Sequence, residues 1–334
     1  MEERMIGTTG TRVAPLGLGC MGMSWGYAES GRDDAESIQV IREALDTGVQ
    51  LIDTARVYGD GHNERLVGDA IRGRRDDVVL ASKGGMTVDL ASRRMGRDGR
   101  PNALRQHVKD GLTHLGVDRI DLYYLHRIDP NVPLAESWGA LADLVAEGKI
   151  GALGVSEVAI SQAETAHAIH PVTAIQSELS LWTRDPITGG SAADGDFAGG
   201  GSSAGGNLLR WASEHGVTFV PFAPLGRGYL TGTLNPNSFE QGDFRAANPR
   251  FTADAFAQNQ TISDTVARIA DAHGATSAQV ALAWLLGLGE NIIPIPGTRK
   301  SAHLRDNLRA LDLHLTNDER QTPDGLPAPS GSRY

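Results

Sequence analysis

The stretch Leu51-Ile52-Asp53-Thr54-Ala55-Arg56-Val57-Tyr58-Gly59 joins a short apolar run, typical of a strand, to a polar turn that carries a tyrosine. Two later apolar runs end in the same way, one before Lys83 and the other before His126. In a parallel β-barrel the carboxyl ends of the strands meet at one face, where active sites are built. The pattern therefore predicts that Asp53, Tyr58, Lys83 and His126 share one site.

Strand-like runs alternate with helix-period segments along the chain, which is the pattern of repeated β-α units around a parallel sheet. The eight candidate strands are Leu16 to Gly19, Leu51 to Asp53, Val78 to Ser82, Leu122 to Leu125, Ala152 to Val155, Ala174 to Gln176, Phe219 to Pro221 and Ile292 to Ile295. Helical spacing lies between them at Leu104, Val108, Leu112 and Leu115, at Trp138, Leu141 and Val145, and at Ile262, Val266 and Ile269. Together they predict an α/β fold, a (β/α)8 TIM barrel covered by helices.

The length of 334 residues is normal for one such barrel with insertions, so residues 1–334 are predicted to form a single domain. Two segments fall outside the repeat. Arg4 to Pro15 is predicted to form a small β-hairpin that plugs one end of the barrel. The Gly/Ser-rich stretch at about 189–206 has little to bury and is predicted to be a flexible insertion. Its composition favours a passive insertion over a mobile lid above the site.

The composition is that of a globular protein and argues against several other classes. Hydrophobic residues make up 40% and charged residues 22%, and no apolar run reaches the ~20 residues that a membrane span needs. The first residues lack the hydrophobic stretch of a signal peptide, and Cys20 is the only cysteine, so a cytoplasmic location is expected. The net charge of -10 argues against a nucleic-acid partner. Arg93, Arg94, Arg97 and Arg100 are a local exception; we expect a solvated loop there, the alternative being a rim that attracts an anionic substrate or cofactor.

The four ionisable residues at the predicted strand ends suit proton transfer. Tyrosine normally titrates near pH 10, and a neighbouring ammonium such as Lys83 favours the phenolate and lowers the pKa. A carboxylate such as Asp53 would keep the lysine charged, and His126 would orient a carbonyl oxygen by hydrogen bonding. Any one of these residues alone is more often structural than catalytic, and only the shared arrangement predicts a site.

Two other kinds of site are poorly supported. Gly17-Leu18-Gly19-Cys20-Met21-Gly22 satisfies the G-x-G-x-x-G pattern of a Rossmann dinucleotide site, but that motif requires a helix to open at its third glycine. Here the next helix-like segment begins only near Asp33. His167 and His170 lack the i, i+4 spacing of a helical metal-binding pair, and no zinc-type cysteine and histidine cluster is present, so no metal is expected.

Further motifs with specific spacings surround the four residues. They are Asp53-Thr54-Ala55 with Tyr58-Gly59, Asn63-Glu64, Ser82-Lys83, the run from Gly116 to His126, Gly154-Val155-Ser156, Pro224-Leu225-Gly226-Arg227-Gly228 and Pro294-Ile295-Pro296-Gly297-Thr298. With these motifs the chain resembles the aldo-keto reductase family over nearly its whole length. Within the family it is most similar to bacterial NADPH-dependent reductases with the Pro-Leu-Gly-Arg-Gly turn, a branch also similar to potassium-channel β subunits.

The resemblance implies a barrel that binds NADPH or NADP+ without a Rossmann domain and reduces an aldehyde or ketone to an alcohol. In that reading Tyr58 donates the proton, Lys83 depresses its pKa, Asp53 supports Lys83 and His126 positions the carbonyl oxygen. The implied cofactor-binding residues are Cys20, Met21, Ser156, Gln176, Phe222, Leu225, Gly226, Arg227, Gly297, Arg299, His303, Asp306 and Asn307.

Each part of the cofactor has an implied place among these residues. Ser156 and Gln176 would bond the nicotinamide amide, Phe222 would stack on the ring, and backbone N–H groups of the turn at 225–227 would cradle the pyrophosphate. Gly297 and the residues after it would hold the adenosine end. Arg299 and Lys300 stand where the resemblance places the 2'-phosphate, which predicts a preference for NADPH over NADH.

The predicted substrate pocket departs from the family pattern. Its candidate residues are Trp25, Arg56, Gly84, Leu179 and Trp182. Leu179 replaces a frequent tyrosine, Gly84 stands where an aromatic residue often follows the lysine, and Arg56 adds a cation where relatives usually have an acid. Glu157 likewise replaces a frequent asparagine, and Ala223 a frequent serine. The loss of two aromatic residues predicts a wider pocket. We expect neutral drift in a broad-specificity reductase, the alternative being selection for a bulky or anionic substrate.

Two other functions stay open at this point. One is an NADP(H)-binding regulatory subunit of a partner protein, and the other is a modified reaction, a dehydration or isomerisation, on a biosynthetic intermediate. A small-molecule carbonyl substrate, with neither nucleic acid nor membrane, is the predicted partner. The sequence does not determine which carbonyl compound is used, the direction of the reaction or the oligomeric state.

Overall fold

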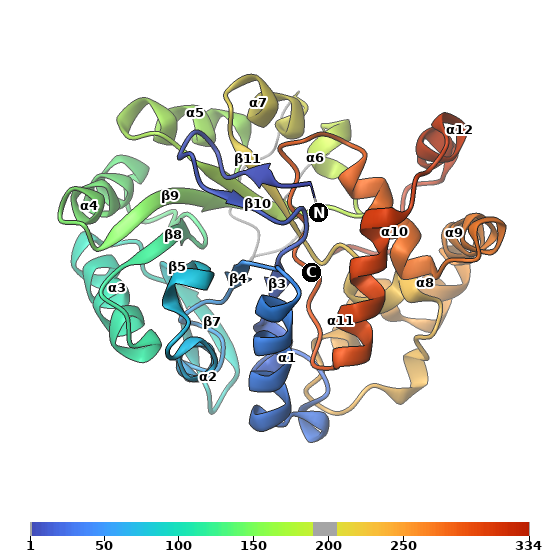
Figure 1. Ribbon diagram of the computed structural model, residues 1–334, viewed down its shortest axis with the longest axis horizontal. Coiled ribbons are helices and arrows are strands. Elements are labelled where there is room, and N and C mark those ends of the chain that lie inside the picture. The colour runs from blue at the N-terminus through green and yellow to red at the C-terminus, as the bar shows by residue number, and fades with distance from the viewer. Residues whose placement is uncertain (1, 190–205, 334) are drawn as a thin grey trace.

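The computed structural model describes residues 2–189 and 206–333, and its centre is a barrel of parallel strands (Figure 1). Seven strands are hydrogen-bonded in the order β11-β10-β9-β8-β5-β4-β3. They are β3 (Leu18–Gly19), β4 (Leu51–Asp53), β5 (Val79–Gly84), β8 (Ile120–Leu125), β9 (Ile150–Ser156), β10 (Ala174–Glu178) and β11 (Thr218–Phe222). The predicted insertion at about 189–206 lies outside the described residues except at its two ends.

The eighth expected strand, 292–295, is an extended segment rather than a regular strand. Pro294 and Pro296 have no N–H to donate, so this stretch cannot form a continuous ladder. It nevertheless joins β11 to β3, because the Ile293 N–H donates to Phe219 O (2.9 Å) and the Gly17 N–H donates to Pro294 O (2.9 Å). The predicted barrel is therefore confirmed, with the correction that prolines make its eighth member irregular.

Helices surround the barrel on its outer side (Figure 1). They are α1 (Asp34–Asp46), α2 (His62–Ile71), α3 (Pro101–Leu115), α4 (Leu134–Ala146), α5 (Ile160–Ile169), α6 (Asp185–Thr188), α7 (Leu208–Glu214), α8 (Ala253–Gln258), α9 (Gln260–His273), α10 (Ser277–Leu286), α11 (Ser301–Leu308) and α12 (Asn317–Gln321). The three helices predicted from apolar spacing are confirmed as α3, α4 and α9. Within the described ranges, no helix combines the length and the apolar character that crossing a membrane requires.

Local capping signals explain where several of these helices begin and end. Asp33 caps α1, because its carboxylate accepts the Glu36 N–H (2.8 Å). Thr276 and Gln279 form a capping box at the start of α10. Gly116 ends α3 in the left-handed conformation that glycine adopts without a steric penalty.

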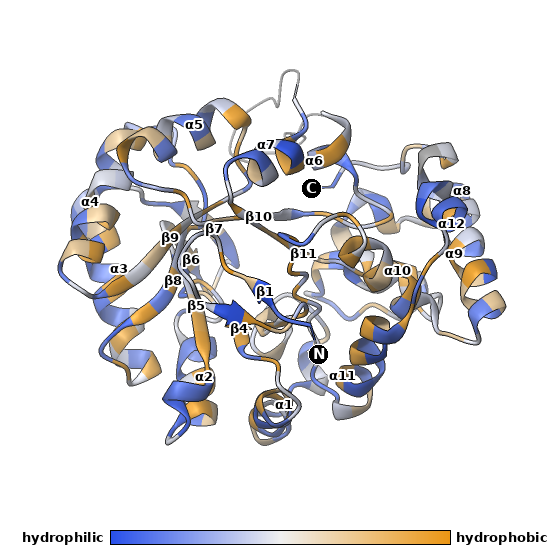
Figure 2. Ribbon diagram, turned by 45° about the horizontal axis from the view of Figure 1, so that its top comes forward, coloured by the Kyte–Doolittle hydropathy of each residue, from blue (hydrophilic) through white to orange (hydrophobic). Residues whose placement is uncertain are grey.

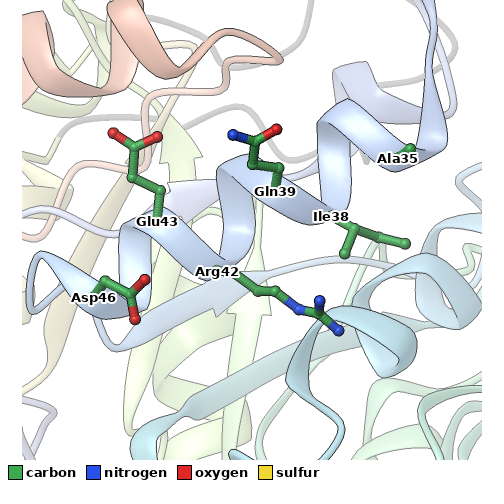
Figure 3. A pocket seen from close by; sticks show the side chains of 6 residues that line it. All are labelled: Ala35, Ile38, Gln39, Arg42, Glu43 and Asp46. Atoms are coloured by element: carbon green, nitrogen blue, oxygen red, sulfur yellow. The ribbon is translucent and has the colours of Figure 1, made fainter.

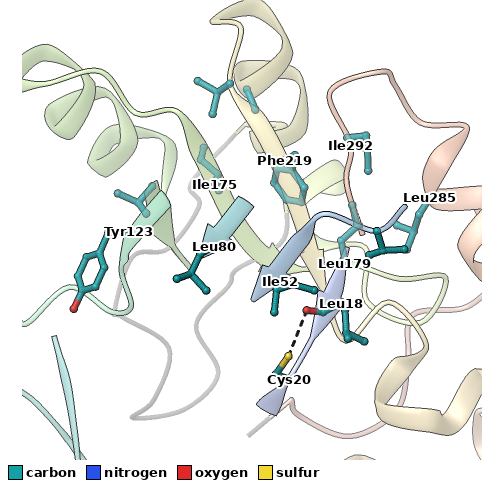
Figure 4. Close-up of a cluster of buried hydrophobic side chains, with 14 of the residues drawn as sticks. Leu18, Cys20, Ile52, Leu80, Tyr123, Ile175, Leu179, Phe219, Leu285 and Ile292 are labelled. Atoms are coloured by element: carbon teal, nitrogen blue, oxygen red, sulfur yellow. Dashed lines mark hydrogen bonds between the residues drawn. The ribbon is translucent and has the colours of Figure 1, made fainter. Parts of the chain in front are cut away.

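Alternation along the strands divides most of the hydrophobic core into two clusters. One contains residues of the strands, the closing segment and the N-terminal hairpin, which places it inside the barrel: Ile6, Val13, Leu51, Ala81, Leu122, Tyr124, Ala152, Ala174, Val220, Ile293 and Ile295. The other pairs the intervening strand residues, such as Ile52, Leu80 and Tyr123, with the apolar faces of the helices (Figure 4). In Figure 2 the helices accordingly carry both hydrophobic and hydrophilic residues.

The predicted N-terminal hairpin is confirmed and closes the amino end of the barrel. Its strands β1 (Arg4–Met5) and β2 (Arg12–Val13) pair antiparallel. Ile6 and Val13 are 3% and 0% exposed and belong to the interior cluster. The Gly7 N–H donates to Thr218 Oγ1 (2.7 Å) at the start of β11. The opposite, carboxyl end of the strands is therefore the open end.

The arginine-rich stretch after β5 is a second hairpin rather than an irregular loop, and Arg93, Arg94 and Arg100 are exposed on it, as expected of a solvated segment. Strand β6 (Met86–Asp89) pairs antiparallel with β7 (Arg94–Arg97). Arg93, in the turn between them, pairs with Glu29 and donates to Gly242 O (2.7 Å). The basic residue thus ties this hairpin to two other loops at the carboxyl end of the barrel.

Candidate active site

Lys83 is the centre of a buried hydrogen-bonded group at the ends of β4 and β5. Its Nζ donates to Asp53 Oδ1 (2.5 Å), to the Thr54 carbonyl oxygen (2.9 Å) and to the Tyr58 hydroxyl (3.3 Å). Lys83 is fully buried, and Asp53 and Tyr58 are 3% and 8% exposed. Burial lowers the pKa of Lys83, but Asp53 and Tyr58 outweigh burial and raise it. The lysine is therefore charged beside the tyrosine hydroxyl.

A buried asparagine fixes the turn that presents Tyr58. Asn63 Oδ1 accepts the Thr54 hydroxyl (2.6 Å), and its Nδ2 donates to Cys20 O (2.9 Å) and Ser24 Oγ (2.8 Å). Asn63 is 0% exposed, so these bonds are removed from competing water. The Cys20 side chain lies in the outer core, which is the cluster between the strands and the helices (Figure 4). Cys20 therefore contacts Asn63 through its backbone carbonyl and not through its side chain.

The net direction of the pKa shift of Tyr58 differs from the expectation. Burial raises the pKa of Tyr58 more than the Lys83 ammonium lowers it, so the net shift is upward. Lys83 therefore lowers the pKa of Tyr58 as predicted, but burial is the larger effect and determines the net direction. The raised pKa favours the protonated hydroxyl, whereas the Lys83 ammonium favours the phenolate form.

His126, at the end of β8, lies edge-on to Tyr58. The two ring centroids are 5.8 Å apart and the ring planes meet at 86°. Burial lowers the pKa of His126 well below its usual value, and the charges of Arg127 and Lys83 lower it further. Its buried Nδ1 has no hydrogen-bond partner in the described part of the chain. The site therefore holds a neutral imidazole next to the tyrosine.

The two residues predicted to bind the nicotinamide amide lie next to this group. Gln176 Nε2 donates to Asp53 Oδ2 (2.8 Å). Ser156 Oγ accepts a hydrogen bond from Arg127 Nη1 (2.9 Å), which also donates to His126 O (2.6 Å). Arg127 is a site residue that the sequence reasoning missed, although its position directly after His126 was a signal that could have identified it.

The turn predicted to cradle the pyrophosphate has an unusual backbone. Ala223, Gly226, Arg227 and Gly228 all have positive φ, between 47° and 96°. The Gly226 N–H donates to Ala223 O (2.9 Å), so this amide is already used within the turn. The Arg227 side chain pairs with Glu178 (2.7 Å) at the end of β10. Phe222, the predicted stacking residue, is partly buried against the interior cluster.

Two arginines gather at the predicted adenosine end. Arg299 Nη1 donates to Ala28 O (2.9 Å). Burial lowers the pKa of Arg32, and the neighbouring charge of Arg299 lowers it further. The buried Nε of Arg32 has no hydrogen-bond partner within the described ranges. Arg32, which the sequence reasoning missed because it lies far from Arg299 in the chain, thus adds a second cation near the predicted 2'-phosphate position.

Two other residues near the predicted adenosine end, Asp306 and Lys300, already have side-chain partners. The Asp306 carboxylate accepts hydrogen bonds from Thr276 Oγ1 (3.0 Å) and Gln279 Nε2 (2.7 Å) and so helps to hold the start of α10. Lys300 pairs with Glu36 (2.8 Å). On α11, His303 is exposed and Asn307 is buried, and Gly297 forms a parallel bridge with Gly19.

Gly84 does not widen the predicted pocket, because a neighbouring side chain occupies the space that a side chain at this position would need. A Cβ at this position would overlap the Tyr123 hydroxyl. Leu179 and Trp182 are 0% and 1% exposed and belong to the outer core, where Trp182 stacks on Tyr229 with a centroid distance of 4.2 Å. These three predicted pocket residues therefore do not line an open pocket in this structure.

The other two predicted pocket residues have different surroundings. Arg56 pairs with Asp60 (2.9 Å) and Asp110 (3.4 Å), so carboxylates on its own turn and on α3 neutralise its charge. Trp25 packs with Met21 against the small cluster that contains Tyr58 and Met86. The structure thus brings Trp25, among the predicted pocket residues, to the side of Tyr58.

Two surface cavities lie away from the tetrad, which is the group of Asp53, Tyr58, Lys83 and His126. One, of about 360 Å³, runs along α1 and is lined by Ala35, Ile38, Gln39, Arg42, Glu43 and Asp46 (Figure 3). The other, of about 1170 Å³, lies at the amino end of the barrel beside the N-terminal hairpin. Neither includes a tetrad residue. A search of the described residues finds no group of three or more metal-binding side chains.

The sequence of this chain matches a known protein family. The model of the Aldo/keto reductase family matches residues 15–326. A protein named probable aldo-keto reductase 1 from Glycine max is 38% identical over 336 residues, covering 98% of this chain and 90% of its own length. The aldo-keto reductase str7 from Strobilurus tenacellus is 38% identical over 329 residues, covering 96% and 90%.

Solved structures agree with the fold. A glycerol dehydrogenase from Gluconobacter oxydans superposes with a TM-score of 0.82 at 29% identity, over 96% of this chain and 94% of its own. An aldo/keto reductase from Klebsiella pneumoniae, in complex with NADP and acetate, has a TM-score of 0.70 at 26% identity, over 100% and 98%. The branch within the family stays a prediction. The family match and the relatives together show that this chain belongs to the aldo/keto reductase family.

Proposed function

We propose that this protein reduces an aldehyde or ketone to an alcohol with NADPH, and that Tyr58 donates the proton. The observation that carries the proposal is the buried Tyr58 hydroxyl 3.3 Å from Lys83 Nζ, with Lys83 held in turn by Asp53. The cofactor assignment is supported by solved relatives from Klebsiella pneumoniae, which are in complex with NADP and with NADPH. Ser156 and Gln176, beside the tetrad, are suited to bond the amide of a nicotinamide.

NADPH, when bound, supplies the hydride, and the chain's own residues handle the proton. As negative charge develops on the carbonyl oxygen, the Tyr58 hydroxyl transfers its proton to that oxygen. The phenolate left behind is stabilised by the adjacent Lys83 ammonium, whose charge Asp53 maintains. The neutral His126 imidazole donates a hydrogen bond that orients the carbonyl oxygen. Tyr58 is 8% exposed, so it regains a proton through the open end of the barrel.

We assign the 2'-phosphate of NADPH to the guanidinium groups of Arg299 and Arg32. Arginine binds phosphate through paired N–H groups that lysine cannot offer in the same geometry. Arg32 retains a buried Nε without a partner in the described segments; Glu29, 3.9 Å from its Nη1, offsets part of its charge, and the charge of Arg299 lies nearby. This arrangement supports a preference for NADPH over NADH.

The test is NADPH oxidation, followed by absorbance, against a panel of aldehydes, ketones and sugar derivatives. We expect oxidation that depends on both protein and carbonyl compound, with little activity when NADH replaces NADPH. Tight NADPH binding without turnover on any carbonyl compound would instead favour a regulatory subunit. Product analysis distinguishes reduction from a dehydration or isomerisation, since only reduction yields one alcohol for each NADPH consumed.

A further inference from the structure

A cluster of buried charges lies beside Ser156 and Gln176 and takes no part in the proposed proton transfer. Its carboxylates are Glu157, Glu178 and Asp185, and its guanidinium groups are Arg227, Arg250 and Arg333. Glu157, Glu178 and Arg333 are only 3%, 1% and 5% exposed. Charges removed from water to this degree persist only where they are paired.

Glu157 ties the ends of two strands together. Its φ of 53° lies in the left-handed region, which a residue other than glycine occupies at an energetic cost. Its N–H donates to Gln176 O (3.0 Å), and its carboxylate accepts the Glu178 N–H (2.8 Å). Because Ser156 directly precedes Glu157 and pairs in register with Gln176, these bonds also set the separation of the two amide-binding residues.

Arg333 supplies the charge that Glu157 needs. Its Nη2 donates to Glu157 Oε2 (2.7 Å), and its other nitrogens lie 3.9 Å from Glu178 and 3.8 Å from Asp185. Glu178 has a second cation, Arg227, at 2.7 Å. Burial raises the pKa of Glu178, but Arg227 and Arg333 outweigh burial and lower it to about 2. Among the described residues, Glu157 depends on Arg333, whereas Glu178 does not depend on Arg333 alone.

The segment that carries Arg333 is anchored over a length of several residues. Ser330 exchanges hydrogen bonds with Asn259 in both directions, through its N–H (2.8 Å) and its carbonyl oxygen (3.1 Å). The Gly331 carbonyl accepts from Arg250 Nε (3.1 Å), and the Arg333 carbonyl accepts from Asn248 Nδ2 (2.7 Å).

We propose that Arg333 is a positioning residue for the cofactor: by neutralising Glu157 it holds the ends of β9 and β10 where Ser156 and Gln176 meet the nicotinamide amide. The inference rests on the proposed function, because it assumes that this end of the barrel binds NADPH. Without Arg333, the Glu157 carboxylate is buried without its cation and must turn toward water. That movement displaces Glu157, which joins the ends of β9 and β10, and so changes the separation of Ser156 and Gln176. The hydrogen bonds within the tetrad remain.

The experiment compares Arg333→Met, Glu157→Gln and the double variant in the full chain. Glutamine keeps an oxygen that accepts the Glu178 N–H and removes only the charge. We expect Arg333→Met to weaken NADPH binding by about tenfold, measured by fluorescence titration, because an unpaired buried charge is strongly unfavourable. The double variant should bind NADPH more tightly than Arg333→Met, since no unpaired carboxylate remains at position 157.

Arg250→Met is the matched control, because Arg250 is buried and anchors the same segment but contacts Thr183 instead of Glu157 (2.6 Å to Oγ1). Adding Glu157→Gln to Arg250→Met should not restore the affinity for NADPH. If the methionine variant does not fold, Arg333→Lys is the second test: it keeps a cation beside Glu157, so it should bind NADPH nearly as tightly as the unmodified protein, and a loss of about tenfold would overturn the proposal. The proposal is overturned if Arg333→Met binds NADPH as the unmodified protein does, or if the double variant is as impaired as the single. Failure of the unmodified protein itself to bind NADPH would instead count against the proposed function.

Discussion

Replacing Tyr58 by phenylalanine should reduce the rate of the reaction with little loss of stability, because the hydroxyl makes only a weak stabilising contact in the structure. Its described hydrogen bond is to Lys83 at 3.3 Å, slightly longer than an ordinary N–H···O bond. Lys83 keeps its bonds to Asp53 (2.5 Å) and to the Thr54 carbonyl (2.9 Å) in the variant. We therefore expect the free energy of unfolding to fall by no more than about 1 kcal/mol.

The effect on the reaction should be much larger. General acid catalysis typically contributes about 10²- to 10⁴-fold, which corresponds to about 3 to 5 kcal/mol of barrier. Burial keeps the pKa of Tyr58 above its usual value, so the substitution removes a neutral proton donor and not a charge. The aromatic ring and its packing against Met86 and Val57 remain. The affinity for NADPH should consequently stay within about threefold of that of the unmodified protein.

The assay measures kcat/KM for carbonyl reduction, the NADPH dissociation constant and the thermal midpoint of both proteins. Tyr123→Phe is the control, because Tyr123 is also fully buried and its hydroxyl has no hydrogen-bond partner in the described part of the chain. That variant should keep its activity. Turnover of Tyr58→Phe at the level of the unmodified protein would refute the assignment of Tyr58 as the acid. A large loss of NADPH affinity or of stability would refute the reasoning that the hydroxyl acts only in proton transfer.

Three further predictions concern the rest of the site. Lys83→Met should abolish reduction and also lower the free energy of unfolding by about 3 to 5 kcal/mol in a denaturant titration, since Asp53 is left buried without its cation; a small loss would contradict the pairing. Arg299→Ala should reduce the preference for NADPH over NADH by about tenfold in paired binding titrations, and an unchanged ratio would remove Arg299 from the phosphate site. Gly189 and Gly206 lie side by side, so joining them by a short linker should change neither kcat nor the thermal midpoint, whereas a clear fall in kcat alone would indicate a lid.

The tetrad could be predicted from the sequence because each of its residues follows a recognisable strand in a parallel barrel. Once β4, β5 and β8 are adjacent, Asp53, Lys83 and His126 must emerge at the same end. Tyr58 follows within the short turn after β4. No other information was needed to bring these four side chains together.

The predicted substrate pocket could not be derived in the same way, because packing depends on neighbours that are distant in the chain. Gly84 suggested an enlarged pocket, but the space beside it belongs to Tyr123 on the adjacent strand. The pairing of Arg333 with Glu157 likewise joins residues with no shared periodicity or motif. The effect of burial on the pKa of Tyr58 also required the surroundings of the hydroxyl and not only the identity of its cationic neighbour.

The irregular closing segment gives the barrel a weak seam between the two ends of the chain. Pro294 lies within it and Pro296 directly follows it, so the seam depends on the amides of Gly17, Gly19, Ile293 and Ile295. Bringing such distant segments together carries a large loop-closure entropy, which favours formation of the seam late in folding. In native-state hydrogen exchange, these four amides should take up deuterium before those of β8 and β9, which lie in the middle of the sheet.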